Sequence, residues 1–197
     1  MRKLFRQVDA CAALAPAQAV HRTHGTWGDR HMKDRAILFD WGGTLMESMP
    51  YYLGPGSGWS QVPPVEGAAQ TLQLLRSSWL MGLASNASES EEGEIRKSLE
   101  CMGVGLLLDR IYTYRSIGRP KPWPEFWRHV LADLGLAPGR VVMVGDDFMG
   151  DVWGATNAGM SAVWLNLGSA DVRSGDRYTT IHRFADLPQA LRLLGFD

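Results

Sequence analysis

Short apolar runs that end in a polar side chain recur along the sequence and alternate with stretches of helical spacing. AILFD ends in Asp40, WLMGLAS ends in Ser85, and RVVMVGDD ends in two aspartates. Such runs are typical of buried strands. Strands that alternate with helices are typical of a parallel sheet with helices on both faces. We therefore predict an α/β, Rossmann-like fold with a parallel sheet of about five strands.

The same patterns place the individual elements. Strands are expected at residues 36–40, 79–85, 110–114, 140–147 and 161–166. Helices are expected at residues 65–78, 89–102, 124–135, 151–160 and 184–195. Pro64 is placed to begin the first helix. Ser88 and Glu91 offer a capping box for the second helix.

Length and charge limit the classes of protein to consider. A chain of 197 residues with 45% hydrophobic residues suits one core domain, expected at 32–197. Residues 1–31 are rich in basic residues and lack periodicity, so a poorly ordered extension is expected there. The net charge of −1 gives no indication of nucleic-acid binding. No apolar run is long enough to span a bilayer, and no convincing secretory signal is present, so a cytoplasmic location is expected.

Several side chains are expected to meet at one edge of the sheet. The carboxyl ends of parallel strands form the ligand crevice in such folds. Asp40, Ser85, Asp146 and Asp147 follow strands, and Lys121 precedes a helix. Carboxylates gathered at one edge repel each other unless a cation such as Mg²⁺ neutralises them. A hydroxyl, a lysine and a Gly-rich turn beside them suit a phosphate.

Four segments together resemble the motifs of the haloacid dehalogenase (HAD) superfamily. ILFDWGGT is similar to its first motif, D-x-D-G-T after an apolar strand, and LMGLASN to its second. GRPKPWPEFW resembles the third motif, and VVMVGDDFMGDVWGATNAGM resembles the fourth, G-D-x(4)-D before a Gly-Ala helix. The resemblance covers residues 35–166 and implies a Mg²⁺-dependent phosphatase, since most members of the superfamily have that activity.

The resemblance assigns the metal site to carboxylates and one carbonyl. It implies that Asp40 is the nucleophile and a metal ligand, and that Asp146 is the second metal carboxylate. The backbone carbonyl of Gly42 would be a further ligand. Asp151 would lie on the outer side of the metal or position the lysine, and Asp147 would add charge nearby.

The phosphoryl group would be held by a second set of residues. Ser85 and Asn86 would bind its oxygens, together with Gly43 and Thr44 of the turn after the first strand. Lys121 would neutralise the charge that grows between the nucleophile and phosphorus.

Gly42 departs from the family pattern. Family phosphatases have an aspartate there, whose carbonyl binds the metal and whose side chain protonates the leaving group. Gly42 retains the carbonyl and lacks the acid. The expected metal site therefore remains, whereas general acid catalysis, worth roughly 10²–10⁴-fold, is lost unless it is replaced. Glu47 is the nearest carboxylate that could replace it, although it is also expected to be a solvated loop residue.

The segments between the motifs leave no space for a full cap domain. Residues 45–64 form a long loop, and one helix follows it before the second strand. Tyr51, Tyr52 and Trp59 of this loop would form the lip of an open site. Such a site would admit a small phosphorylated molecule or a bulkier substrate.

Three functions are compatible with these residues. The leading hypothesis is a Mg²⁺-dependent phosphohydrolase that acts through an aspartyl-phosphate and favours activated phosphates. A dehalogenase- or phosphonatase-like hydrolase that breaks a carbon–substituent bond is an alternative, against which Lys121 and the paired aspartates of the fourth motif argue. A catalytically weak metal-binding regulatory module is a second alternative, supported by Gly42.

Overall fold

The structure is a computed structural model, which describes residues 33–48 and 62–197. The expected extension 1–31 lies outside the described residues, as do Tyr51, Tyr52 and Trp59 of the expected lip.

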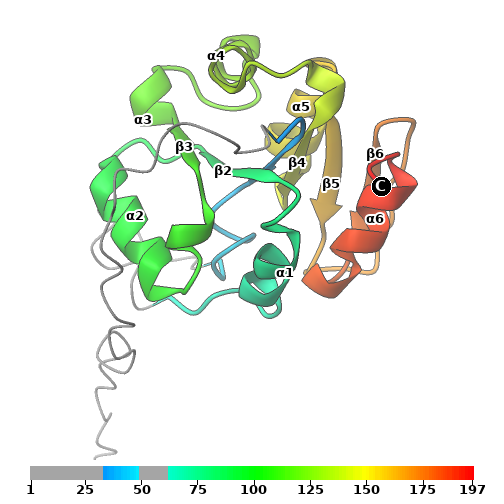
Figure 1. The fold of residues 1–197 in the computed structure, drawn as a ribbon, viewed down its shortest axis with the longest axis horizontal. Coiled ribbons are helices and arrows are strands. Elements are labelled where there is room, and N and C mark those ends of the chain that lie inside the picture. The colour runs from blue at the N-terminus through cyan, green and yellow to red at the C-terminus, as the bar shows by residue number, and fades with distance from the viewer. Residues whose placement is uncertain (1–32, 49–61) are drawn as a thin grey trace, which may run out of the picture. The chain divides into compact units, whose positions relative to one another are not determined.

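The centre of residues 33–197 is one parallel sheet with the strand order β3-β2-β1-β4-β5-β6 (Figure 1). Every neighbouring pair of strands is parallel, which confirms the predicted α/β architecture. The first three strands are β1 (Ala36–Phe39), β2 (Leu80–Ser85) and β3 (Arg110–Thr113). The others are β4 (Val141–Gly145), β5 (Ser161–Leu165) and β6 (Tyr178–Ile181).

The sixth strand is absent from the sequence prediction. It is a short edge strand whose first three residues are only partly buried, and its sequence, YTTI, lacks an apolar run. Its conformation depends on pairing with β5, for example between Leu165 and Ile181, and such pairing is not visible in local sequence.

Helices cover both faces of the sheet (Figure 1). One face is covered by α1 (Ala68–Leu75), α2 (Glu92–Cys101) and α6 (Leu187–Leu193). The other carries α4 (Pro124–Leu134) and α5 (Gly154–Asn157), and α3 (Tyr114–Ile117) follows β3. Short 3₁₀ turns occur at Gly105–Leu107, Pro138–Arg140 and Phe184–Asp186, and a π-helical turn occurs at Phe148–Trp153.

The side chains of strand β1 are buried in apolar cores on both faces of the sheet. Ile37 and Phe39 belong to the core beneath α1, α2 and α6, whereas Ala36 and Leu38 belong to the core beneath α4 and α5. All four residues are completely buried. A central parallel strand therefore reads as a continuous apolar run and has no alternation.

The starts of the first two helices differ from the prediction. Pro64 does not begin α1, because its segment pairs with the turn after β1, as in the bridge between Met46 and Pro64. The helix begins after Gly67, whose φ of 80° is left-handed. The capping box of α2 is formed by Glu91 and Glu94, not by Ser88 and Glu91, so this helix begins at Glu92.

The connections around the site are short where they are described. Residues between β2 and β3 form α2 and one 3₁₀ turn, and the described residues between β1 and β2 form a tight turn and α1. Residues 49–61 lie outside the described residues, and the expected absence of a full cap domain stays a prediction. In the described part of the chain, no helix combines the length and the apolar character that crossing a bilayer requires.

Candidate active site

Asp40 lies immediately beyond the carboxyl end of β1, at the centre of the sheet. Its N–H donates to the carbonyl of Val144 on β4 at 2.9 Å, which extends the strand pairing by one residue. The chain then turns sharply, and the N–H groups of Leu45 and Met46 both donate to the carbonyl of Trp41 at 3.0 Å. The side chain of Asp40 is 14% exposed, so it is partly accessible at this edge of the sheet.

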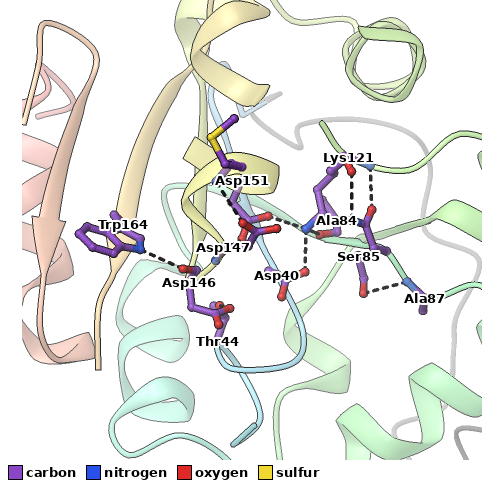
Figure 2. Close-up of polar contacts among 12 residues, drawn as sticks. Asp40, Thr44, Ala84, Ser85, Ala87, Lys121, Asp146, Asp147, Asp151 and Trp164 are labelled. Carbon is purple, nitrogen blue, oxygen red and sulfur yellow. Dashed lines mark hydrogen bonds and ion pairs between the residues drawn. The ribbon is translucent and has the colours of Figure 1, made fainter. Parts of the chain in front are cut away.

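Lys121 is buried at the centre of the site, and its ammonium group has three acceptors (Figure 2). Nζ donates to Oδ1 of Asp40 at 2.7 Å and to Oδ1 of Asp151 at 2.5 Å. The third acceptor is the carbonyl of Ala84 on β2, at 2.7 Å. The three acceptors match the three donors of an ammonium group, which fixes the position of the lysine.

The carboxylates of Asp40, Asp146 and Asp151 lie together, with ligand oxygens within 4.8 Å of one another. Asp146 follows β4, and its Oδ1 accepts from the Thr44 hydroxyl at 3.0 Å. Asp151 is completely buried in the π-helical turn, and its Oδ2 accepts from the N–H of Asp147 at 3.1 Å. The structure thus brings together the predicted nucleophile, lysine and metal carboxylates.

The charges of this cluster are not balanced by Lys121 alone. Burial, and then the negative charge of Asp40, raise the pKa of Asp146 to about 6. Burial also raises the pKa of Asp151, despite its ion pair with Lys121. Burial by itself would lower the pKa of Lys121, but Asp40 and Asp151 outweigh it and raise that pKa, so the ammonium stays protonated. Three carboxylates around one ammonium leave an excess of negative charge.

This excess fits a hard divalent cation. Mg²⁺ prefers carboxylate, carbonyl and water oxygens and is commonly held by one or two carboxylates. Within the described residues, no hydrogen-bond donor contacts Oδ2 of Asp40, whereas both oxygens of Asp151 are engaged by Lys121 and Asp147. Asp40 and Asp146 are therefore better placed than Asp151 to hold the ion directly.

Two glycines beside the cluster have different surroundings. Gly43 has a φ of +80°, and a Cβ added there would overlap the carboxylate of Asp146. Gly42 lacks a positive φ, and the nearest atom to an added Cβ would be the terminal methyl of Met46, at 4.0 Å. The close approach of the turn to Asp146 thus requires glycine at position 43 and not at position 42.

We expect Gly43→Ala to lower the free energy of unfolding by at least about 1–2 kcal/mol, because alanine is strained at positive φ and its Cβ meets Asp146. Gly42→Ala is the matched control and should leave stability unchanged or raise it by up to about 1 kcal/mol. Chemical denaturation of the three proteins measures both changes. Equal stabilities of the two variants would contradict this account of the turn.

Three of the predicted phosphate-binding residues make hydrogen bonds within the protein. The N–H of Gly43 donates to the Met46 carbonyl at 2.7 Å, and that of Thr44 lies 3.4 Å from the Trp41 carbonyl. Ser85 is buried at the end of β2, and its hydroxyl accepts from the N–H of Ala87 at 3.3 Å (Figure 2). The contacts of Gly43, Thr44 and Ser85 with a phosphate stay predictions.

Asn86 has a contact that the sequence did not suggest. Its side-chain oxygen accepts from the N–H of Lys121 at 2.7 Å, and its Nδ2 donates to the Lys121 carbonyl at 3.1 Å. This pair of hydrogen bonds ties the end of β2 to the lysine segment. Asn86 thus holds the backbone of Lys121, and its expected contact with phosphate stays a prediction.

Two further carboxylates lie at the margin of the cluster. Asp147 is exposed, and its Oδ1 accepts from the N–H of Met149 at 3.0 Å, so it caps the π-helical turn. Its predicted contribution to the metal site stays a prediction. Glu47 is exposed, and its N–H donates to the Pro63 carbonyl at 3.0 Å. No described contact joins Glu47 to Asp40, Lys121 or Asp146.

Comparison with known proteins identifies the family. The family model described as haloacid dehalogenase-like hydrolase matches residues 51–159, which is more than half of the chain. The chain belongs to this family. The match includes Ser85, Lys121, Asp146 and Asp151 of the site.

Individual relatives of this HAD-like chain include enzymes named as phosphatases. Glyceraldehyde 3-phosphate phosphatase of Methanothermobacter thermautotrophicus is 35% identical over 104 residues, which cover 52% of this chain and 45% of that protein. Phosphoserine phosphatase of Thermus thermophilus is 41% identical over 89 residues, which cover 41% of this chain and 36% of that protein. The matched segment thus spans about half or less of these curated relatives.

A solved structure is similar over a larger part of the HAD-like chain. An uncharacterized protein from Listeria monocytogenes serotype 4b is 26% identical and superimposes with a TM-score of 0.71. The superposition covers 82% of this chain and 98% of that one. The two proteins therefore share the fold over most of this chain and over almost the whole of the Listeria protein.

Besides the contact of Asn86 with Lys121, two other contacts of the HAD-like site were missed by sequence reasoning. The carbonyl of Ala84 accepts from Lys121, and a backbone acceptor has no sequence signal. The indole Nε1 of Trp164 donates to the backbone carbonyl of Asp146 at 2.9 Å. In the sequence Trp164 is one apolar residue of a strand, and nothing there indicates that its N–H reaches the site.

Proposed function

We propose that this protein is a Mg²⁺-dependent phosphohydrolase that acts through an aspartyl-phosphate on Asp40. The observation that carries the proposal is the group of three carboxylates at the carboxyl edge of the sheet, of which Asp151 is fully buried, with the Lys121 ammonium between Asp40 and Asp151. Relatives named as phosphatases and membership of the HAD-like family support phosphoryl chemistry.

In the proposed first step, a carboxylate oxygen of Asp40 attacks phosphorus and the bond from phosphorus to the leaving group breaks. The electron pair of that bond stays with the leaving group. Lys121 stays protonated, touches the nucleophile at 2.7 Å, and stabilises negative charge on the transferring group. Mg²⁺, held by Asp40, Asp146 and the Gly42 carbonyl, would supply further neutralisation of the phosphoryl charge.

The second proposed step releases phosphate from the enzyme. A water molecule attacks the phosphorus atom of the aspartyl-phosphate, the bond from phosphorus to the Asp40 oxygen breaks, and the proton of the water passes to solvent. The carboxylate of Asp40 is thereby restored. Asp151 and Asn86 act on Lys121 in both steps, because one holds its ammonium and the other its backbone.

The substrate is proposed to be an activated phosphate whose leaving group departs without protonation. Gly42 offers no acid, and no described contact brings Glu47 to the cluster. A carboxylate released from an acyl phosphate is already a good leaving group. Both a small phosphorylated molecule and a bulkier one are compatible with this chemistry, and a cytoplasmic location stays a prediction.

The test compares substrates with and without metal. We expect the purified protein to release inorganic phosphate from acetyl phosphate with Mg²⁺, and to release it much more slowly from glycerol 3-phosphate. Excess chelator should reduce turnover of acetyl phosphate to the uncatalysed rate, and added Mg²⁺ should restore it. Phosphate release that persists in chelator would contradict the metal requirement.

Two other outcomes would favour the alternative functions. Halide release from 2-chloropropionate without metal would favour a dehalogenase-like reaction at carbon. Mg²⁺ binding without turnover of a phosphate ester, an acyl phosphate or a halogenated acid would favour a metal-binding regulatory module. Lys121 supports the phosphohydrolase over both, because it is buried and aimed at the proposed nucleophile.

A further inference from the structure

Trp164 connects the neighbouring strand to the loop that carries Asp146. In the sheet it lies opposite Gly145, the last residue of β4. Its indole Nε1 extends past the end of β4 and donates to the Asp146 carbonyl at 2.9 Å (Figure 2). This carbonyl lies just beyond the last residue of β4, so the indole continues the interstrand pairing by one side-chain hydrogen bond.

The ring of Trp164 is itself held by an aromatic group. Phe148 meets it edge to face with centroids 5.4 Å apart, and Tyr178 meets Phe148 at 5.7 Å. The guanidinium of Arg173 lies over both rings, 4.4 Å from the centroid of Phe148 and 4.9 Å from that of Trp164. Cation–π contacts of this kind are attractive within about 6 Å.

Arg173 is in turn fixed by the edge strand. Its N–H donates to the hydroxyl of Thr180 on β6 at 2.9 Å, and that hydroxyl donates to the Arg173 carbonyl at 2.6 Å. A continuous set of contacts therefore runs from β6, through Arg173 and the aromatic rings, to the backbone of Asp146. Trp164, Arg173 and Thr180 lie outside the four segments that resemble the family motifs, whereas Phe148 lies within the fourth.

We infer that Trp164 is a positioning residue for the metal site, acting through the carbonyl of Asp146; this rests on the proposed function, in which Asp146 is a metal ligand. The peptide group after Asp146 is held by Trp164, and its carboxylate is held by Thr44. The N–H side of the same peptide group donates to Asp151 at 3.1 Å, so the indole supplies one of its two hydrogen bonds. Loss of the indole N–H leaves the peptide group less restrained, which allows the Asp146 carboxylate to shift. Partners that orient metal ligands typically contribute about 10–100-fold to metal affinity.

The test uses Trp164→Phe, which retains an aromatic ring in the strand and removes only the N–H and part of the ring. Trp79→Phe is the matched control. Trp79 is also buried, packs against Phe196 at 5.3 Å and lies under Arg35 at 4.6 Å, but it precedes β2 at the opposite edge of the sheet. Calorimetric titration with Mg²⁺ measures affinity without substrate, and thermal unfolding in chelator measures the stability of each fold.

We expect Trp164→Phe to weaken Mg²⁺ binding by about tenfold or more, whereas Trp79→Phe binds Mg²⁺ as the unmodified protein does. Arg173→Met, which keeps apolar cover and removes the cation, should weaken it by about two- to fivefold. Trp164→Phe and Arg173→Met can also lower the melting temperature. A Trp79→Phe protein with a similarly lowered melting temperature but unchanged Mg²⁺ affinity would show that destabilisation alone does not weaken Mg²⁺ binding.

Two results would overturn the inference, and they differ in what else they affect. Mg²⁺ affinity of Trp164→Phe within twofold of the unmodified protein would overturn the role of Trp164 and leave the proposed function intact. Absence of Mg²⁺ binding in the unmodified protein would overturn the proposed metal-dependent function, and this inference with it.

Discussion

Asp40→Asn is expected to abolish turnover of acetyl phosphate, with kcat lowered by about 10⁴-fold or more. Replacing the nucleophile of a covalent mechanism removes the first step altogether, and comparable losses in other hydrolases reach about 10⁶-fold. The asparagine retains an oxygen that can accept from Lys121, so the ammonium should keep its position. Steady-state kinetics with saturating Mg²⁺ measure the change.

A second measurement makes the role of Asp40 specific. Acid quenching during turnover should trap a phosphoryl group on the peptide that contains Asp40, and mass spectrometry should find no such group in Asp40→Asn. Asp176→Asn is a control, because Asp176 is an exposed aspartate between β5 and β6, and its kcat should stay within about twofold of the unmodified protein. An Asp40→Asn protein that keeps a tenth of the original kcat would rule out Asp40 as the nucleophile.

The layout of the sheet was predictable because burial in a parallel sheet leaves a simple pattern. β1 and β4 are apolar throughout, and β2 and β5 are apolar except for one terminal serine each. All five residues of both β4 and β5 are buried. The edge strand β6 was not predictable, because its two threonines are half-exposed and its conformation comes from the neighbouring strand. The predicted start of α1 was wrong because Pro64 pairs with Met46 in a β-bridge and so does not begin the helix.

The candidate site was predictable as far as strand ends could define it. Asp40 and Asp146 converge because parallel strands carry the residues that follow them to one edge. Lys121 reaches the same edge from the segment between α3 and α4. The contacts that refine the site depend on register and side-chain direction, which sequence does not encode locally. The bond from Trp164 exists because that residue lies opposite Gly145, and Asn86 turns toward the Lys121 backbone.

The available space at position 42 bears directly on the missing acid. The first-motif turn could exclude a side chain there, in which case glycine would be a steric requirement. It does not: among the residues that the structure describes, an added Cβ would meet only Met46, at 4.0 Å, and φ is not positive. The described backbone at position 42 therefore accepts a Cβ without a clash, so the glycine there is not required by the geometry of the turn.

We therefore expect Gly42→Asp to raise kcat/KM for glycerol 3-phosphate by up to about 10²–10⁴-fold, the usual contribution of a general acid. Turnover of acetyl phosphate should change little, because its carboxylate leaving group does not need the proton. The ratio of the two kcat/KM values, measured with saturating Mg²⁺, isolates the effect from any change in metal affinity.

The pH dependence of Gly42→Asp gives the decisive control. The added carboxyl group assists only when protonated, so the gain on the ester should be largest at low pH and disappear as pH rises through the pKa of the new group. Gly42→Asn occupies similar space without an ionisable proton and should show neither the gain nor this alkaline limb. Equal ester rates in Gly42→Asp and Gly42→Asn would mean that the protein does not lack an acid at all, and that the proton reaches the leaving group by another route.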